Sequence, residues 1–195
     1  MKGRDLLISN GAAVCIAYDV ETGEEVWRIP QGEDSTIAMP VESGGLVYFY
    51  TGFVVSPEGE KYSELLAVDP DGEGEITRSN IRWSIKSPPL QLLTPVVKNG
   101  LLFTIDSRAN LLCLDALTGE RVWSEKLKGK YNSSPVWAAG NIYFSSTRGE
   151  TYVIRAGRTR DVISVNTLEG EIWATPALAD GSILLRTSKA LYKIR

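Results

Sequence analysis

The amino-acid sequence predicts an all-β fold made of repeated four-stranded antiparallel sheets. Three observations carry this prediction: a strand motif recurs along the chain, a proline signature precedes most copies of it, and short apolar runs follow turn residues. Four short strands in each repeat of about 40 to 50 residues are typical of β-propellers. No segment shows a sustained helical period of apolar residues, so helices are not expected.

The strand motif consists of two apolar residues, a small residue, another apolar residue and Asp. Its copies end at Asp19, Asp69 and Asp115 and, in weaker form, at Arg155 and Arg195. A Thr-Gly-Glu turn follows the first and third copies, and Trp27 and Trp123 each lie eight residues past the Asp. Such coinciding offsets indicate an internal repeat.

The proline signature and the apolar runs mark two further strands in each unit. The signature occurs at Met39-Pro40-Val41, Thr94-Pro95-Val96, Ser134-Pro135-Val136 and Thr175-Pro176-Ala177. The runs that follow Gly, Asn or Asp turns are Leu46–Tyr50, Leu101–Ile105, Ile142–Ser145 and Ile183–Leu185. This pattern is typical of antiparallel strands joined by tight hairpins, and the Trp-bearing segment supplies the fourth strand.

The spacing of these landmarks sets the predicted units. Pro95 precedes Asp115 by 20 residues, and the same spacing counted back from Asp19 falls just before the first residue. The first unit is therefore expected to have three strands. The last unit is also expected to have three, because its copy of the strand motif ends at Arg195. The predicted units are about 1–30, 31–86, 87–128, 129–168 and 169–195, within one propeller arc over 1–195. We expect a partial ring of about four and a half blades, with a closed five-bladed ring as the alternative.

Taken together, these motifs resemble the pyrroloquinoline-quinone-like (PQQ-like) β-propeller repeat over essentially the whole chain. The resemblance implies the C-terminal blades of a larger propeller, in which a Trp of the outermost strand docks between blades against the small residue of the strand motif. By position, the implied docking residues are Trp27, Trp83 and Trp123, and their small partners are Ala17, Ala67 and Cys113. The fourth unit departs from the pattern, because Ile163 stands eight residues past Arg155 and the Thr-Gly-Glu turn is missing.

The composition excludes several functional classes. The chain has no histidine, which removes imidazole metal ligands and Ser/His or Cys/His nucleophile pairs. Lys and Arg form no run that could follow a phosphate backbone, so nucleic acid is not an expected partner. No apolar run approaches the roughly 18 residues of a membrane span, and residues 1–5 do not resemble a signal peptide.

The longest departure from the repeat lies in the second unit, where Phe53–Lys61 and Asp69–Glu75 lengthen two connections. Functional residues are often carried by such insertions. Acidic residues alternate at positions 69, 71, 73 and 75, which superficially resembles a calcium loop. Pro70 and the missing distal Glu favour a solvated acidic turn instead, so no metal residue is assigned.

The remaining candidates are more simply explained by the fold. Asp19, Asp69 and Asp115 are expected to bond the turns that follow their strands. Cys15 and Cys113 are expected to be small core residues without a disulfide. Two other groups remain as candidates: a basic cluster that binds an acidic partner or is solvated, and aromatics that pack in the core or stack on a ligand. They comprise Arg148, Arg155, Arg158 and Arg160, and Trp137 and Trp173.

The expected function is therefore a non-catalytic binding or scaffold module, similar to the barrel-assembly scaffold lipoproteins within the PQQ-like family. One alternative is a fragment of a quinoprotein dehydrogenase with PQQ and calcium, although the adjacent Cys-Cys pair common in that class is absent. Another is a carbohydrate-binding propeller. No catalytic, cofactor-binding or metal residue is assigned. Expected partners are a protein, the missing blades or a second copy at open blade edges, and the resemblance implies a periplasmic or extracytoplasmic location.

Overall fold

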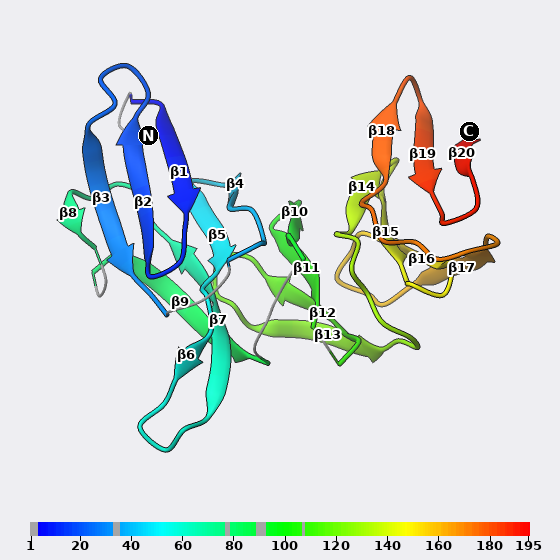
Figure 1. The fold of residues 1–195 in the computed structure, drawn as a ribbon, viewed down its shortest axis with the longest axis horizontal. Coiled ribbons are helices and arrows are strands. Elements are labelled where there is room, and N and C mark those ends of the chain that lie inside the picture. Colours follow the sequence, from blue (N-terminus) through cyan, green and yellow to red (C-terminus); the bar gives the residue numbers. More distant parts are fainter. Residues whose placement is uncertain (1–3, 33–35, 77–78, 89–92, 107) are drawn as a thin grey trace. The chain divides into compact units, whose positions relative to one another are not determined.

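The computed structural model describes residues 4–32, 36–76, 79–88, 93–106 and 108–195 (Figure 1). The starting residues 1–3 considered above lie outside this part. The chain divides into two compact units: unit 1 comprises Met1–Gln91 and Ala116–Gly119, and unit 2 comprises Leu92–Asp115 and Glu120–Arg195. All regular elements in the described ranges are strands, and these ranges contain no helix suited to crossing a membrane.

Unit 1 contains two sheets whose neighbouring long strands are antiparallel. The first sheet joins β1 (Leu6–Asn10), β2 (Val14–Asp19) and β3 (Glu25–Pro30), with the short β8 (Gly74–Glu75) parallel to β3. The second sheet joins β4 (Val41–Ser43), β5 (Leu46–Tyr50), β7 (Lys61–Val68) and β9 (Ile81–Ser87). The short β6 (Val54–Val55) pairs with the beginning of β7.

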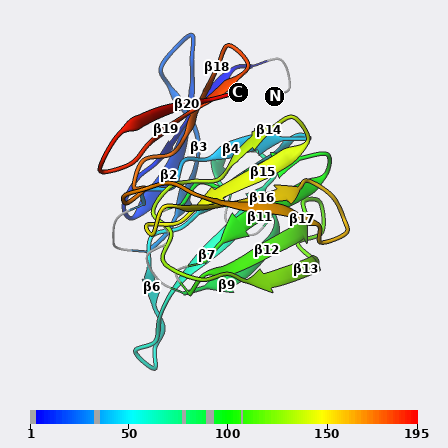
Figure 2. The same ribbon diagram turned by 90° about the vertical axis from the view of Figure 1, so that its right-hand side faces the viewer.

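Unit 2 contains three antiparallel sheets (Figures 1 and 2). The first comprises β10 (Val96–Lys98), β11 (Leu101–Ile105), β12 (Asn110–Asp115) and β13 (Arg121–Lys126). The second comprises β14 (Val136–Ala138), β15 (Asn141–Ser145), β16 (Glu150–Arg155) and β17 (Val162–Thr167). The third comprises β18 (Ala177–Ala179), β19 (Ser182–Arg186) and β20 (Leu191–Ile194).

Apart from β6 and β8, the described strands fall into sheets of three, four, four, four and three, in chain order. This confirms the predicted all-β fold of four-stranded antiparallel sheets. The four apolar runs become β5, β11, β15 and β19, each next to the strand that ends the motif. Turn residues in the left-handed region connect several of these strands, such as Asn99 with φ 53° and Gly100 with φ 72°.

The strand that ends the motif and the Trp-bearing strand after it share one register in three of the sheets. Trp27 pairs with Ala17, Trp83 with Ala67, and Trp123 with Cys113. The register shifts directly after each of these pairs, so a β-bulge recurs at the same place. The three Trp residues therefore lie opposite the small partners that the sequence predicted.

The fourth sheet corrects one expectation. Its β16–β17 register places Ser164, not Ile163, at the Trp position, opposite Val153. The connection between β16 and β17 is one residue longer than that between β12 and β13, so an offset of eight residues falls one residue short. The register, rather than a fixed offset, therefore decides which residue takes the Trp position.

Each unit has its own core. Unit 1 buries Cys15, Trp27 and Phe49, and unit 2 buries Phe103, Cys113, Phe144 and other apolar residues. Cys15 and Cys113 are free thiols, as expected. Burial raises the pKa of each thiol to about 12, so neither is poised as a nucleophile near neutral pH.

Candidate functional site

The candidate binding surface consists of the two insertions of unit 1, which are the β6–β7 hairpin and the acidic loop from Asp69 to Glu75. The hairpin extends beyond the two sheets of its unit in both views (Figures 1 and 2). Its strands are fixed by the pairs Val54 with Tyr62 and Val55 with Lys61. Val55 is 50% exposed, so the hairpin presents an apolar side chain to solvent.

The turn of the hairpin is held by its own backbone. Ser56 N donates to the Glu60 carbonyl at 2.8 Å, and Gly59 N donates to the Ser56 carbonyl at 2.8 Å. Gly59 adopts φ 84°, a conformation that favours glycine. The Glu58 backbone N–H and the Ser56 hydroxyl lower the pKa of the Glu58 carboxyl. The hairpin tip is therefore acidic and conformationally defined.

The base of the hairpin is packed closely against unit 1. A Cβ at Gly32 would lie 2.1 Å from the Phe53 carbonyl oxygen, so the two backbone segments approach in a way that only glycine permits. Lys61 Nζ lies 4.8 Å from the centroid of the Phe53 ring, and Lys86 Nζ lies 4.2 Å from that of Tyr62. These cation–π contacts orient the aromatic rings at the base.

The acidic loop is organised by hydrogen bonds and an ion pair of Asp69. Asp69 Oδ1 accepts from Asp71 N at 3.0 Å, and its other oxygen pairs with Arg82. Asn80 Nδ2 donates to the Asp69 carbonyl at 3.0 Å. In the described ranges, no three His, Cys, Asp or Glu side chains gather closely enough to hold a metal. The Asp69 carboxylate thus serves the turn, as its repeat position predicted.

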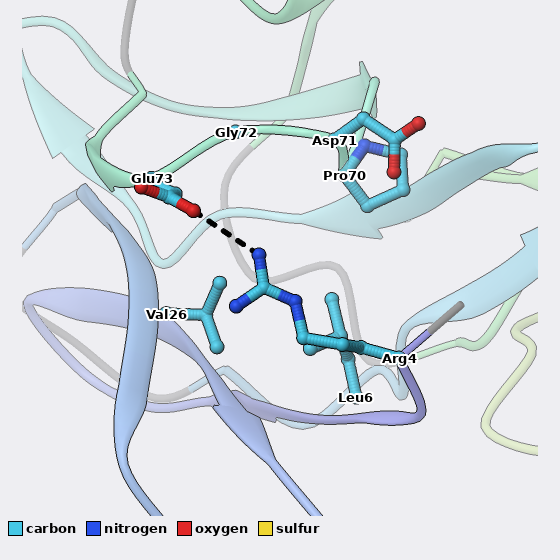
Figure 3. A pocket seen from close by; sticks show the side chains of 7 residues that line it. All are labelled: Arg4, Leu6, Val26, Pro70, Asp71, Gly72 and Glu73. Atoms are coloured by element: carbon cyan, nitrogen blue, oxygen red, sulfur yellow. Dashed lines mark hydrogen bonds and ion pairs between the residues drawn. The ribbon is translucent and has the colours of Figure 1, made fainter. Parts of the chain in front are cut away.

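A pocket of about 260 Å³ lies between this loop and the first sheet (Figure 3). Leu6 and Val26 form apolar walls, and the guanidinium of Arg4 points toward Glu73, with 3.1 Å between Nη2 and Oε1. Arg4 escaped the sequence analysis because its partner is 69 residues away and no local motif connects them. The pocket combines apolar walls with one cation, Arg4, and two carboxylates, Asp71 and Glu73.

The strand-end Asp residues of the other units also serve structure. Asp19 Oδ1 accepts from Glu21 N at 2.9 Å and from Thr22 N at 3.0 Å, and these backbone donors lower the pKa of Asp19. Asp115 Oδ2 pairs with Arg158 at 3.0 Å. The predicted turn-bonding role is therefore observed for Asp19, while Asp115 also holds an ion pair.

The predicted basic cluster does not converge on one point. Arg155 pairs with Asp161 at 2.9 Å, whereas Arg158 and Arg160 reach back to the preceding sheet. Arg160 pairs with Glu125 at 2.6 Å. The Arg148 side chain lies near Gly129 instead. Arg158 and Arg160 fasten the β16–β17 connection to the β10–β13 sheet, and the three paired arginines do not form a joint anion site.

The docking tryptophans differ in how their indole N–H groups are satisfied. Trp83 donates to the Ala116 carbonyl at 2.9 Å, within unit 1, and Trp123 donates to the Gly157 carbonyl at 3.0 Å, within unit 2. Trp27 is fully buried, yet its N–H has no partner among the described residues. Trp83 and Trp123 are half-buried, so they are less enclosed than Trp27.

The two remaining tryptophans have different environments. Trp137 is half-buried against the core of unit 2, and Lys98 Nζ lies 4.3 Å from its ring centroid. Trp173 is 59% exposed, so core packing, one of the two expectations for it, is wrong. Its indole N–H donates to Glu171 Oε2 at 3.1 Å beside a hollow of about 300 Å³ that Arg186 also lines.

Comparison with known proteins places this architecture in a family. Residues 1–194 match the model of the PQQ-like repeat family described as outer membrane protein assembly factor BamB. Tetrathionate hydrolase of Acidithiobacillus ferrooxidans is 27% identical over 188 residues, and the match covers 87% of this chain and 37% of the relative. BamB of Nitrosomonas eutropha is 24% identical over 110 residues, covering 55% and 26%.

Among solved structures, BamB from Moraxella catarrhalis superposes with a TM-score of 0.67 at 16% identity. The superposition covers 96% of this chain and 53% of that protein, and at this identity it establishes the propeller fold alone. The chain spans only about a quarter to two fifths of the two curated relatives. By its sequence motifs, its sheets and this match over nearly its whole length, the chain belongs to the PQQ-like repeat family of BamB.

Proposed function

We propose that the chain is a non-catalytic scaffold module that binds a protein partner through the insertions of unit 1. The β6–β7 hairpin carries this proposal. It lies outside the repeat, its turn is fixed by backbone hydrogen bonds, and it presents the exposed Val55 next to an acidic tip. A preorganised strand pair with an apolar side chain costs little conformational entropy when a partner binds.

The family supports a scaffold role. The family model and one curated relative carry the name outer membrane protein assembly factor, which describes participation in an assembly. The same resemblance supports a location outside the cytoplasm as part of this proposal. The acidic tip and loop favour a partner with basic residues, because opposite charges steer association and select partners.

Site-specific photo-crosslinking tests this proposal. A photoreactive amino acid at position 55 should give a discrete protein adduct in the cell envelope of the native host, identified by mass spectrometry. Val165 is 47% exposed on β17 and serves as the matched control, because it is apolar and accessible but lies outside the insertions. Equal labelling at both positions, or no adduct at position 55, would contradict the proposal.

A carbohydrate ligand is the second candidate, and Trp173 favours it. An exposed indole beside a carboxylate and a guanidinium resembles a sugar-stacking platform, and Glu171 and Arg186 supply the polar groups. Titration with soluble oligosaccharides should change the fluorescence of the parent protein but not of Trp173→Ala. Identical titrations of the two proteins would remove this candidate.

The similarity to tetrathionate hydrolase and to the PQQ-like repeat also suggests an enzyme. If the chain is a scaffold, we expect it not to turn over tetrathionate and not to bind a chromophore after reconstitution with PQQ and calcium. Its melting curves in EDTA and in millimolar calcium should superimpose. Asp69, the best-placed carboxylate of the acidic loop, is already bonded to Arg82 and Asp71. A calcium-dependent rise in Tm that Asp71→Ala abolishes would instead indicate a calcium site in the acidic loop.

A further inference from the structure

A further cavity lies wholly within unit 2, between the β14–β17 sheet and the β18–β20 sheet. Its volume is about 370 Å³. The residues that line it are uncharged and mainly apolar: Tyr143, Thr151, Val153, Asn166, Leu168, Pro176, Ile183, Leu185 and Ile194. Neither the strand motif nor the insertions account for this space.

The preceding pair of sheets shows what normally fills it. There, Trp123 lies opposite Cys113, its ring centroid is 6.0 Å from that of Phe103, and it packs against the core that contains Ile142 and Ile154. The strand registers show which residues occupy the same positions in the next pair of sheets, β14–β17 and β18–β20. Cys113 corresponds to Val153, Phe103 to Tyr143, Ile142 to Ile183, and Ile154 to Ile194.

All four corresponding residues line the cavity, but the tryptophan is missing. Ser164 occupies the position of Trp123 in the register. Asn166 Nδ2 donates to Ser164 Oγ at 3.1 Å, so Ser164 faces the same side of β17 as Asn166, which lines the cavity. The smaller side chain thus leaves a hollow where an indole is packed one sheet earlier.

We propose that this cavity binds an uncharged aromatic ring of about the size of indole. An engineered apolar cavity of roughly 150 Å³ already binds benzene, and ligand pockets begin near 300 Å³, so a volume of about 370 Å³ admits a bicyclic ring. A charged ligand would lose its hydration without gaining an ionic partner, because no charged side chain lines the cavity.

Polar groups at the cavity can orient the ring. The Asn166 amide is exposed at one side, and the Thr151 hydroxyl, which shares a hydrogen bond of 2.9 Å with Ser145 Oγ, lies on the neighbouring strand. A ring with one polar atom, such as an indole N–H, matches this mixture of surfaces. The ring can belong to a free aromatic molecule or to a Trp side chain of a polypeptide, since both present the same chemistry.

Ligand-observed NMR with free indole tests the proposal. The parent protein should transfer saturation to indole, and Ser164→Trp should abolish the transfer because its own side chain fills the cavity. Val165→Trp is the matched control: it adds the same side chain one residue later, outside the register shift and on the opposite face of β17. Indole binding should therefore survive in Val165→Trp.

Thermal melts keep the test independent of folding defects. Filling an apolar cavity without strain stabilises a protein, so Ser164→Trp should melt above the parent. If Ser164→Trp does not fold, Val153→Phe narrows the same cavity from β16 and should also abolish binding.

A parallel measurement with N-acetyltryptophanamide identifies the source of the ring. Binding of this probe without binding of free indole points to a polypeptide ligand. The proposal is overturned if neither probe binds, or if Ser164→Trp binds as the parent does.

Discussion

At the scale of single residues, indole N–H groups link the turn of one sheet to the outer strand of the sheet before it. Trp123 contributes both the hydrogen bond to the Gly157 carbonyl and apolar contact with Phe103. Gly119 shows how tightly such turns pack, because a Cβ there would lie 2.7 Å from the Trp83 ring. The ring and the donor are therefore both part of the docking contact.

Truncation of Trp123 tests this contact. Trp123→Ala should lower the free energy of unfolding by about 3 kcal/mol, at the lower end of the range for aromatic truncation because Trp123 is only half-buried. Trp123→Phe should cost less, since it keeps a ring and loses only the N–H donor. Urea denaturation measures both values. A Trp123→Ala protein that unfolds at the parent's midpoint would show that the docking role is wrong.

Asp19 predicts a pH dependence of stability. Backbone N–H groups of Thr22 and Glu21 hold the pKa of folded Asp19 below the value of about 3.9 in an unfolded chain. The contribution of Asp19 is therefore complete above the unfolded pKa and is lost as the pH falls through the lowered folded pKa. Asp19→Ala should differ from the parent in urea midpoint at pH 6, and the difference should shrink near pH 2.

Glu21→Ala is the control, because its exposed side chain lies in the same turn without accepting these bonds. A difference between Asp19→Ala and the parent that is equally large at pH 6 and pH 2 would show that the carboxylate charge does not stabilise the turn.

Residue roles that repeat could be predicted from the sequence, and those that occur once could not. Ala17, Ala67 and Cys113 were placed opposite tryptophans because their offsets recur. Ser164 was missed, since one extra residue in a connection shifts the register and leaves no signal in the composition. The pairing of Arg4 with Glu73 has no periodic signal at all.

At the scale of elements, the proline signature does more than begin a strand. Thr94 N donates to Ser134 Oγ at 3.0 Å, and Ser134 N donates to Thr175 Oγ1 at 3.0 Å. Each residue precedes a signature proline, so successive proline strands of unit 2 are joined through hydroxyl groups. The sequence predicted these strands but not the bonds, because the partners are 40 and 41 residues apart.

Ser134→Ala should therefore destabilise unit 2 by about 1 kcal/mol, the net value of a typical hydrogen bond, because Thr94 N loses its acceptor. Ser134→Thr should recover most of this loss, since it retains the hydroxyl. Equilibrium unfolding of the three proteins provides the comparison. If alanine and threonine have the same effect, packing at position 134 rather than the hydrogen bond determines stability.

The two insertions were identifiable as elements because they interrupt a clear period. Their conformations were not, since the β6–β7 turn depends on bonds between Ser56, Gly59 and Glu60, and the acidic loop depends on Arg82 from β9. A periodic pattern predicts where a chain departs from its repeat. The structure of the departure is set by contacts with neighbouring strands.

At the scale of the whole molecule, the propeller fold follows from the repeat, whereas the number of copies that associate in solution depends on surface chemistry. β20 pairs with β19 and with no other described strand. Leu191 on this strand is 71% exposed and Ile194 is 42% exposed, although the corresponding Leu111 and Ile154 are both 0% exposed. Unpaired strand edges with apolar side chains are prone to pair with another chain.

We therefore expect concentration-dependent self-association through the edge formed by β20. Sedimentation velocity should show a sedimentation coefficient that rises with concentration for the parent protein and stays constant for Leu191→Lys, because a charge on an edge strand opposes pairing. Leu117→Lys is the matched control, since Leu117 is 70% exposed but lies in a turn and not on a strand edge. Association should persist in that variant. A parent protein that remains monomeric at every concentration, or a Leu117→Lys variant that loses association as fully as Leu191→Lys does, would show that β20 is not the associating surface.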